Sequence, residues 1–148
     1  MKKILLVKTM ILVVKEVAKE YGFEFKSEEY GKAFKDTFWK DILKDVSNIP
    51  NLIFKDKNGN DYYIELRSFW GIPEIDIRIK NALLVLNYSD YDWELGKHTG
   101  KNFKVNQIRV EGYNYNENLK TIYNLIEKIE KTYKELEKEE NKKILNKN

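Results

Sequence analysis

The sequence contains no cysteine and a single histidine, His98, among its 148 residues. The lack of cysteine excludes disulfide bonds and cysteine-ligated metal sites, and it is typical of proteins that work in a reducing compartment. A zinc site built on one histidine would need carboxylates for its other ligands, which is unusual. We therefore expect a cytoplasmic protein that uses no metal and no other cofactor.

Neither the basic nor the acidic residues are concentrated in one segment of the chain. Lys and Arg number 27 and Asp and Glu number 24, which gives a net charge of +3 spread along the whole chain. A protein that binds duplex nucleic acid usually gathers its basic residues on one segment or face, where they displace counterions from phosphate. The absence of a basic block makes a protein the expected partner, ahead of nucleic acid.

Long hydrophobic runs are scarce as well. The segment MKKILLVKTMILVVKEV begins as a secretory signal does, but Lys8 interrupts its apolar run and no small-residue cleavage site follows. About 10 apolar positions lie between the charges, whereas a membrane-spanning helix needs ~20. We expect a buried helix here and no membrane association.

Apolar residues are nevertheless sufficient for a core, because 42% of the chain is hydrophobic and 14% is aromatic. At this length we expect one domain over residues 1–148, without a linker or an internal repeat. The apolar pattern fades beyond Glu139, so residues 140–148 are predicted to form a frayed tail.

Two helices are predicted before residue 50. In residues 4–21 apolar side chains recur at helical spacing and also lie off that stripe, which favours a helix buried on more than one side. Gly22 would end it, and its first residues, KILLV at 3–7, are also compatible with a strand. Ser27 is a suitable N-cap for a second helix, whose apolar residues are spaced four apart: Tyr30, Phe34, Phe38, Ile42 and Val46.

Residues 52–110 change to a period of two, which indicates five strands. Asn58-Gly59 is a strong hairpin signal. The run EIDIRIK at 74–80 alternates between isoleucines expected in the core and charged residues expected to point outward and pair across strands. Residues 82–88, ALLVLNY, are predicted to form a central strand, and a change of phase near Asn106-Gln107 predicts a β-bulge.

The last segment, 116–146, is predicted to be one long helix. Its apolar residues follow alternating spacings of three and four: Leu119, Ile122, Ile126, Ile129, Tyr133 and Leu136. This seam would pack on the sheet or on the first helix, or it would form a homodimer through residues 119–136. The order ααβββββα predicts an α+β fold, with a five-stranded, mainly antiparallel sheet. Two N-terminal helices and one long C-terminal helix would pack on one face.

The most unusual stretch is NYSDYDWELGKHTGKN, residues 87–102. Acidic and aromatic residues alternate in its first half, and its second half is basic and contains two glycines. Large, amphipathic aromatic side chains anchor protein interfaces, and acidic neighbours suit a basic surface. We predict a partner-binding surface made by Tyr88, Asp90, Tyr91, Asp92, Trp93 and Glu94. The alternative is that Trp93 is a buried core residue.

The second half of this stretch, GKHTGKN, is similar to a phosphate-binding P-loop but is one residue short. A strand rather than a helix is predicted to follow it, so no helix N-terminus would face the anion. A looser phosphate site would use backbone N–H groups together with the basic side chains of Lys97, His98, Lys101 and Lys104. Otherwise these residues form a solvated loop, in which His98 is exposed.

A magnesium-dependent nuclease is a further alternative. In restriction-enzyme-like nucleases an Asp on one strand and an acidic residue two positions before a lysine on the next hold the metal. Asp61 and the Asp76–Arg78 pair approach this pattern, but arginine does not readily give up a proton.

The favoured interpretation is a non-catalytic protein-binding module that acts by occupying its partner. Small, cysteine-free proteins rich in Lys, Asn and Tyr are common among phage and mobile-element inhibitors of host defence or nucleic-acid-handling complexes, and this analogy of format suggests an inhibitor.

Overall fold

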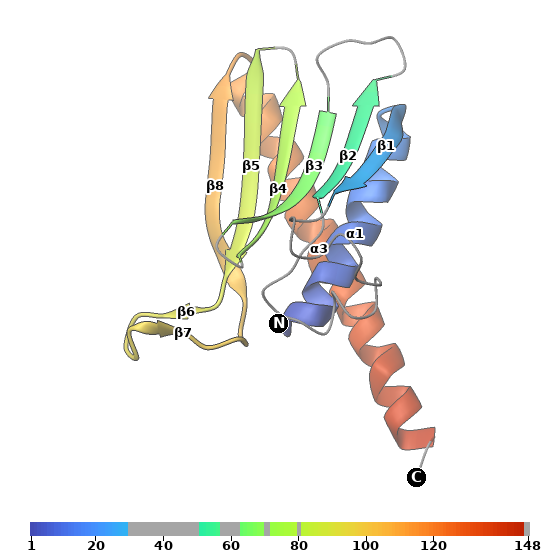
Figure 1. The fold of residues 1–148 in the computed structure, drawn as a ribbon, viewed down its shortest axis with the longest axis vertical. Helices are drawn as coiled ribbons and strands as arrows, with labels where there is room; N and C mark the ends of the chain where they lie inside the picture. Colours follow the sequence, from blue (N-terminus) through green and yellow to red (C-terminus); the bar gives the residue numbers. More distant parts are fainter. Residues whose placement is uncertain (30–50, 57–62, 70–71, 80, 147–148) are drawn as a thin grey trace.

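A computed structural model describes residues 1–29, 51–56, 63–69, 72–79 and 81–146. The helix α1 (Lys3–Glu20) precedes a sheet, and the helix α3 (Tyr115–Asn146) follows it. The sheet has six antiparallel strands in the order β1-β2-β3-β4-β5-β8. Both helices cover the same face of the sheet, so the described residues form an α+β fold with two layers (Figure 1).

The strands of the large sheet are β1 (Phe23–Glu29), β2 (Asn51–Asp56), β3 (Tyr63–Phe69), β4 (Ile72–Ile79), β5 (Ala82–Ser89) and β8 (Lys104–Gly112). Between β5 and β8 the chain forms a separate two-stranded ribbon from β6 (Tyr91–Asp92) and β7 (Lys97–His98).

The helix α1 is buried on most of its circumference, as its sequence predicts. It contacts α3 as well as β1, β3 and β4, and side chains such as Leu6, Met10 and Val13 are fully buried. Residues 3–7 are helical, which excludes the strand alternative. The helix ends at Tyr21, where the N–H groups of Tyr21 and Gly22 donate to carbonyls of the last turn and Gly22 adopts a φ of +72°.

The predicted start of a second helix after Ser27 is wrong. Ser27, Glu28 and Glu29 belong to β1, which pairs with β2 through register partners such as Glu28 and Leu52. The sheet therefore has six strands instead of five. The remainder of the predicted second helix lies outside the described residues, and within the described part of the chain one helix precedes the sheet.

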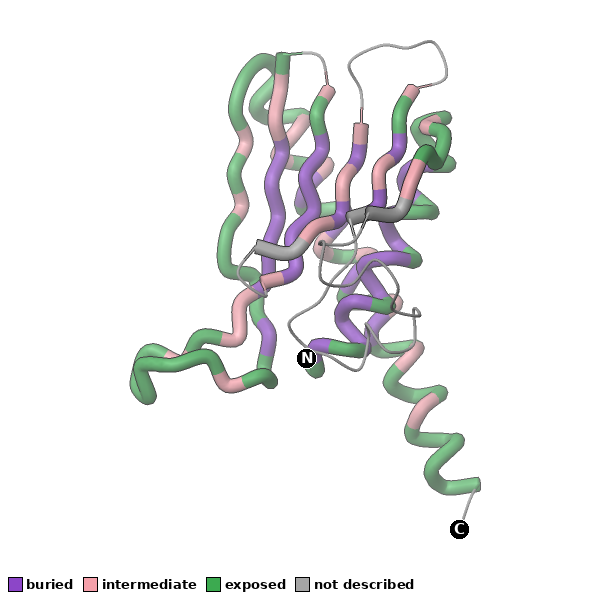
Figure 2. The backbone as a smooth tube through the Cα atoms, in the orientation of Figure 1, coloured by how far each residue is buried: buried purple, intermediate pink, exposed green. Residues whose placement is uncertain are grey.

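Alternation along the strands places one set of side chains against the helices. Ile64, Leu66, Ile75 and Ile77 from β3 and β4 are buried there, as predicted. The antiparallel pairing of β2 with β3 agrees with a hairpin, although Asn58-Gly59 lies outside the described residues. Figure 2 shows that burial is concentrated in α1 and the middle strands.

The strand β5 is an interior strand, paired with both β4 and β8, but it is next to the sheet edge and not at its centre. Asn87 pairs with Gln107 and Tyr88 pairs with Val105, so Asn106 is the additional residue of a bulge on β8. This confirms the bulge predicted near Asn106-Gln107.

The helix α3 packs on α1, β5 and β8 through the predicted seam. Ile122, Ile129 and Tyr133 are buried, and Ile126 and Leu136 are partly buried against the same core. The seam therefore packs within the chain, as the first of the two alternatives predicts, and a homodimer through residues 119–136 stays a prediction. The helix continues to Asn146 beyond the sheet (Figure 1), and the fraying of residues 140–148 stays a prediction.

A search of the helices in the described ranges found none with the length and apolar character needed to cross a membrane.

The turn that joins β8 to α3 can be tested by replacing Gly112 and comparing the effect with replacement of Gly22, a second glycine with positive φ. Gly112 has a φ of +98°, and a Cβ there would overlap the carbonyl oxygen of Asn81 and lie 2.8 Å from the Cα of Ala82. Gly22 has a comparable φ of +72° but open space around it. We expect Gly22→Ala to lower the free energy of unfolding by about 1 kcal/mol and Gly112→Ala by about 3 kcal/mol or more. Urea denaturation measures both, and equal losses would contradict the close backbone contact at Gly112.

Candidate functional site

The residues singled out in the sequence form an arm that leaves the body of the protein. We call residues 90–99, which include β6 and β7, the ribbon. It projects sideways from the end of the sheet where β5 stops and β8 starts (Figure 1). Tyr91 pairs with His98 and Asp92 with Lys97, and most of the ribbon is exposed (Figure 2).

The turn of the ribbon is stabilised by Asp92. Its Oδ1 accepts hydrogen bonds from the N–H groups of Glu94 at 2.9 Å and Leu95 at 3.1 Å, which is an Asx turn. The N–H of Gly96 donates to the Asp92 carbonyl at 2.8 Å, and Gly96 has a φ of +67°. Asp92 therefore fixes the turn that presents its neighbours.

The base of the ribbon is closed by Asp90, whose side chain is only 11% exposed. One carboxylate oxygen lies 2.6 Å from Nδ1 of His98, and the other accepts the N–H of Gly100 at 2.7 Å. Partial burial disfavours the charged form of Asp90, but the hydrogen bonds from His98 and Gly100 outweigh it and lower the pKa of this carboxyl. We call Asp90, His98 and Gly100 the Asp90 clamp.

The aromatic residues of the ribbon lie outside the core. Trp93 is 87% exposed, so the alternative of a buried Trp93 is wrong. Its ring contacts that of Tyr91 edge to face at 4.9 Å, and Tyr91 contacts the imidazole of His98 at 5.1 Å. Tyr91 therefore contacts Trp93 along its own strand segment and His98 across the ribbon. Tyr88, by contrast, is 1% exposed on β5 and belongs to the core, so the structure removes it from the predicted binding surface.

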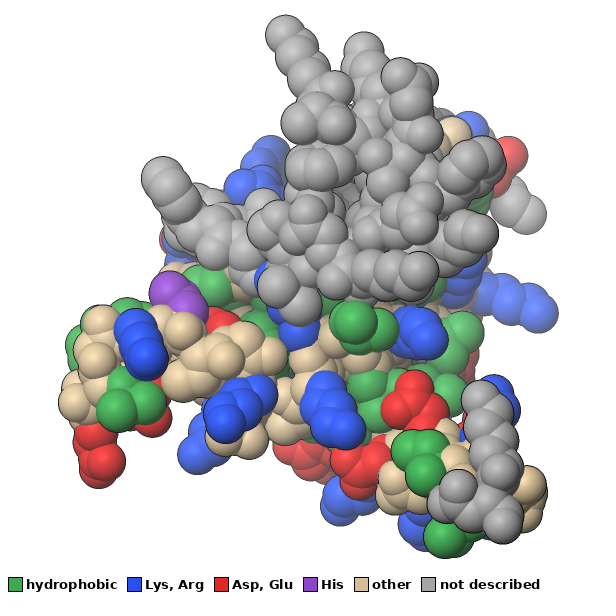
Figure 3. Space-filling view, turned by 60° about the horizontal axis from the view of Figure 1, so that its bottom comes forward, with side chains coloured by type: hydrophobic (Ala, Val, Ile, Leu, Met, Phe, Trp, Pro, Cys, Tyr) green, Lys and Arg blue, Asp and Glu red, His purple; other side chains and the backbone are tan. Residues whose placement is uncertain are grey.

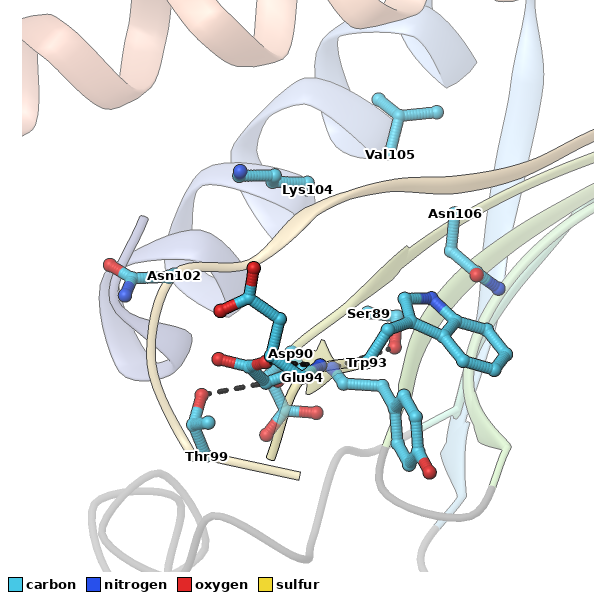
Figure 4. Close-up of a pocket in the computed structure, with 11 residues that line it drawn as sticks. Ser89, Asp90, Trp93, Glu94, Thr99, Asn102, Lys104, Val105 and Asn106 are labelled. Atoms are coloured by element: carbon cyan, nitrogen blue, oxygen red, sulfur yellow. Dashed lines mark hydrogen bonds between the residues drawn. The ribbon is translucent and has the colours of Figure 1, made fainter. Parts of the chain in front are cut away.

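A groove of about 480 Å³ lies between the ribbon and the start of β8. The ribbon contributes Trp93 and Glu94, and β8 contributes Lys104, Val105 and the bulge residue Asn106. Figure 4 draws Trp93 and Asn106 on one side of the groove and Asn102 and Lys104 on the other. The carboxylate of Glu94 has no hydrogen-bond or ion-pair partner among the residues the structure describes.

The predicted phosphate-binding residues are exposed but do not converge. Lys97 and His98 lie on β7, Lys101 lies in the turn after it, and Lys104 begins β8; only Lys104 lines the groove. His98 is exposed as predicted, but it is engaged with Asp90. A strand follows GKHTGKN, as predicted, so no helix N-terminus completes a phosphate site. Figure 3 shows acidic side chains at the end of the ribbon and basic ones along the neighbouring surface.

The face of the sheet opposite the helices carries a row of polar side chains across four strands. Arg67, Glu74, Asn87 and Gln107 are consecutive register partners on β3, β4, β5 and β8. Arg67 Nε lies 3.2 Å from a Glu74 oxygen. The Nδ2 of Asn87 donates to Glu74 at 3.2 Å and to Gln107 at 3.0 Å. We call these four residues the polar row. The predicted pairing of charges across strands is confirmed here.

Asp76 lies beside the polar row on β4, on the predicted outward face, but the residue is buried and only 6% exposed. Arg67 lies 3.5 Å from one of its oxygens, and the other has no hydrogen-bond partner among the described residues. Burial, together with the nearby charge of Glu74, raises the pKa of Asp76 to about 7.

Two residues of the nuclease pattern, Asp76 and Arg78, have other partners in the described structure. Asp76 is held by Arg67, and Arg78 stacks on the Tyr63 ring at 5.3 Å. Asp61 lies outside the described residues. Within the described ranges, no three His, Asp or Glu side chains are grouped so that they could hold a metal ion.

Comparison with protein-family models, with curated proteins and with solved structures found no match to this chain.

Sequence reasoning missed two features of these sites. The Asp90–His98 contact joins residues eight positions apart, and only the ribbon pairing brings them together. Asn87 was included in an apolar strand, although a polar residue in such a run is a signal that a buried hydrogen-bond partner exists.

The Asp90 clamp can be tested by local stability. Asp90→Ala removes two hydrogen bonds to a charged group, so the amide of Gly100 should exchange with solvent about tenfold faster or more. Glu94→Ala is the control, because Glu94 makes no such bond and the exchange of Gly100 should stay unchanged. Hydrogen exchange followed by NMR measures both, and equal exchange in the two variants would contradict a clamp at this carboxylate.

Because Asp76 is buried, we predict that the stability of the fold decreases as the pH rises above the ordinary pKa of a carboxyl group. Its pKa of about 7 in the folded state exceeds the ordinary value of 3.8, so the folded state retains a proton that the unfolded state has lost. Stability should therefore fall as the pH rises from about 4 to about 7. Asp76→Asn should be more stable than the wild type by about 1–2 kcal/mol at pH 8 and lose this advantage at pH 4. Denaturation curves at the two pH values check this, and a pH-independent difference would contradict it.

Proposed function

We propose that this chain is a non-catalytic protein-binding module whose contact surface is the ribbon, with Trp93 as the anchor. The observation that carries this proposal is the 87% exposure of Trp93 on a ribbon whose own backbone is held by Asp90 and Asp92. Tryptophan is among the residues that most often dominate the binding free energy of protein interfaces.

The rigidity of the ribbon supports binding over a merely solvated loop. A flexible loop loses conformational entropy when a partner orders it, and that loss subtracts from affinity. Here the Asx turn, the Asp90 clamp and the contact of Trp93 with Tyr91 already order the presenting segment. Exposed tryptophan on an ordered turn is an arrangement suited to insertion into a pocket of another protein.

The acidic residues of the ribbon divide into two roles. Asp90 is engaged at both oxygens, so its contribution to a partner is its long-range field rather than a direct bond. Glu94 is exposed and unpaired in the described structure, and Asp92 uses one oxygen for the turn. Glu94 and Asp92 would therefore make the direct contacts to Lys or Arg of a basic partner, and all three carboxylates would speed its approach.

A module of this kind acts by occupying its partner. A basic surface that has evolved to hold nucleic acid is one that an acidic aromatic ribbon fits, and blocking it would inhibit the partner's function. An inhibitor of a nucleic-acid-handling or defence complex, of the kind that phage and mobile elements encode, is the role we propose.

The alternative of a nuclease-like or phosphate-binding protein has less support. It would rely on Asp61, Asp76 and Arg78, or on the Lys97–Lys104 loop. Asp76 is buried in an ion pair with Arg67, and of the four basic loop residues only Lys104 lines the groove.

The test is a comparison of two variants that remove an exposed aromatic residue. Trp93→Ala should lose capture of the partner from a lysate of the native host, with affinity lowered by about 30-fold or more once the partner is purified, since an anchor residue is worth ~2 kcal/mol or more. Tyr113→Ala is the matched control, because Tyr113 is 73% exposed but follows the end of β8 that lies away from the ribbon.

Both variants should keep the thermal stability of the wild type, because neither side chain is in the core. Capture of the same proteins by wild type and Trp93→Ala would overturn the ribbon as the binding surface. Magnesium-dependent cleavage of DNA or RNA that Asp76→Ala abolishes would instead establish the enzymatic alternative.

A further inference from the structure

The strand β8 is an edge of the sheet. Among the described residues it pairs only with β5, and Figure 1 shows its outer side facing away from the other strands. Beyond the bulge at Asn106, residues 107–112 pair regularly with β5. An edge strand presents unpaired backbone N–H and C=O groups, which makes it a template for another strand.

The ribbon projects from the sheet on the side of this edge, so β8 and the ribbon form two walls of a corner (Figure 1). The groove of about 480 Å³ lies in this corner and is lined by Val105 and Asn106 from β8 and by Trp93 from the ribbon. A bulge ends regular pairing and turns a side chain into a new direction. A strand added along residues 107–112 would therefore reach the groove at the position of the bulge.

The chemistry of the groove favours a cation. Asp90, Asp92 and Glu94 line it against one lysine, Lys104, so carboxylates are in excess. The lowered pKa of Asp90 keeps its carboxyl ionised at neutral pH. An exposed tryptophan ring beside carboxylates is the preferred environment for a guanidinium or ammonium group, which can lie on the ring face and pair with the acid.

We propose that the partner presents an extended segment that adds to the edge of β8 as a further strand and places an arginine or lysine side chain in the groove beside Trp93 and Glu94. This proposal rests on the proposed function, because it assigns the partner chemistry of the same surface. Backbone pairing would supply affinity along residues 107–112, and the groove would supply selection for the basic side chain.

A second copy of this chain is a less suitable partner for the edge of β8 than a basic segment of another protein. The strand β8 carries two basic side chains, Lys104 and Arg109, and is interrupted by the bulge. The charges and the bulge both hinder the pairing of two identical edges. The carboxylates of the groove also repel the ribbon of a second copy, whereas they attract a basic segment.

The experiment uses three blocked hexapeptides as probes of the full-length protein. The first alternates Arg and Thr, so that an extended strand places all its arginines on one side. The second has Glu in place of Arg. The third keeps the Arg–Thr sequence but carries N-methyl groups on alternate backbone nitrogens, which removes the donors of one strand edge while leaving the charge unchanged. Isothermal titration calorimetry measures affinity, and NMR follows the amides of residues 107–112.

We expect the Arg–Thr peptide to bind and to protect amides of residues 107–112 from exchange. The Glu–Thr and N-methylated peptides should each bind at least tenfold more weakly. Glu94→Gln should weaken binding of the Arg–Thr peptide several-fold, and Glu135→Gln is the control, because Glu135 is exposed on α3, outside both β8 and the groove.

Four results would overturn the inference. Equal affinity of the Arg and Glu peptides would exclude selection for a cation, and equal affinity of the N-methylated peptide would exclude strand addition. Absence of binding at millimolar peptide, or a dimer of the protein alone whose interface protects residues 107–112, would assign the edge to another occupant. If one of these results were found while Trp93→Ala still lost capture of the natural partner, the proposed function would stand and only this inference would fail. Failure of the inference and failure of the proposed function are therefore distinguishable.

Discussion

The burial of α1 against both the sheet and α3 is the constraint on which the rest of this structure depends. Its apolar side chains need two partners, which are the sheet and the helix α3 beside it on the same face. The start of α1 is also connected to the ribbon, because the backbone N–H of Phe103 donates to the carbonyl of Met1 at 3.0 Å. It is connected to α3 as well, because the N–H of Lys2 donates to the Tyr133 hydroxyl at 2.7 Å. Phe103 is buried at the point where the ribbon returns to β8. The exposed arm is thus attached to the most buried part of the protein.

Patterns that depend only on neighbouring residues predicted much of this fold. Helical spacing located α1 and α3, alternation located β3 and β4, a continuous apolar run located β5, and a phase change located the bulge at Asn106. The start of a helix after Ser27 failed because a good N-cap and two glutamates are a local preference, whereas pairing of β1 with β2 is a tertiary contact that outweighs it. A short strand of mixed polar residues, FEFKSEE, gives little signal of its own.

The candidate site was predictable in composition but not in the roles of its members. Alternating acids and aromatic residues identified the ribbon, yet the sequence could not distinguish an exposed Trp93 from a buried one or an exposed Tyr88 from a core residue. The engagement of Asp90 with His98 depends on the pairing of β6 with β7. The burial of Asp76 depends on which charged side chains meet across β3 and β4, and that requires the register of the strands.

The polar row has a consequence for how uniquely the strands can align. A strand displaced by one residue against its neighbour would turn Glu74 and Asn87 toward the helices and would leave an ionised group and an amide without partners in an apolar layer. Alternative alignments of β4 and β5, whose isoleucines and leucines are nearly interchangeable, are penalised by these two side chains. Polar residues inside the sheet therefore determine the register of β4 and β5. The hydrophobic residues around them can differ in shape while the sheet still has one native register.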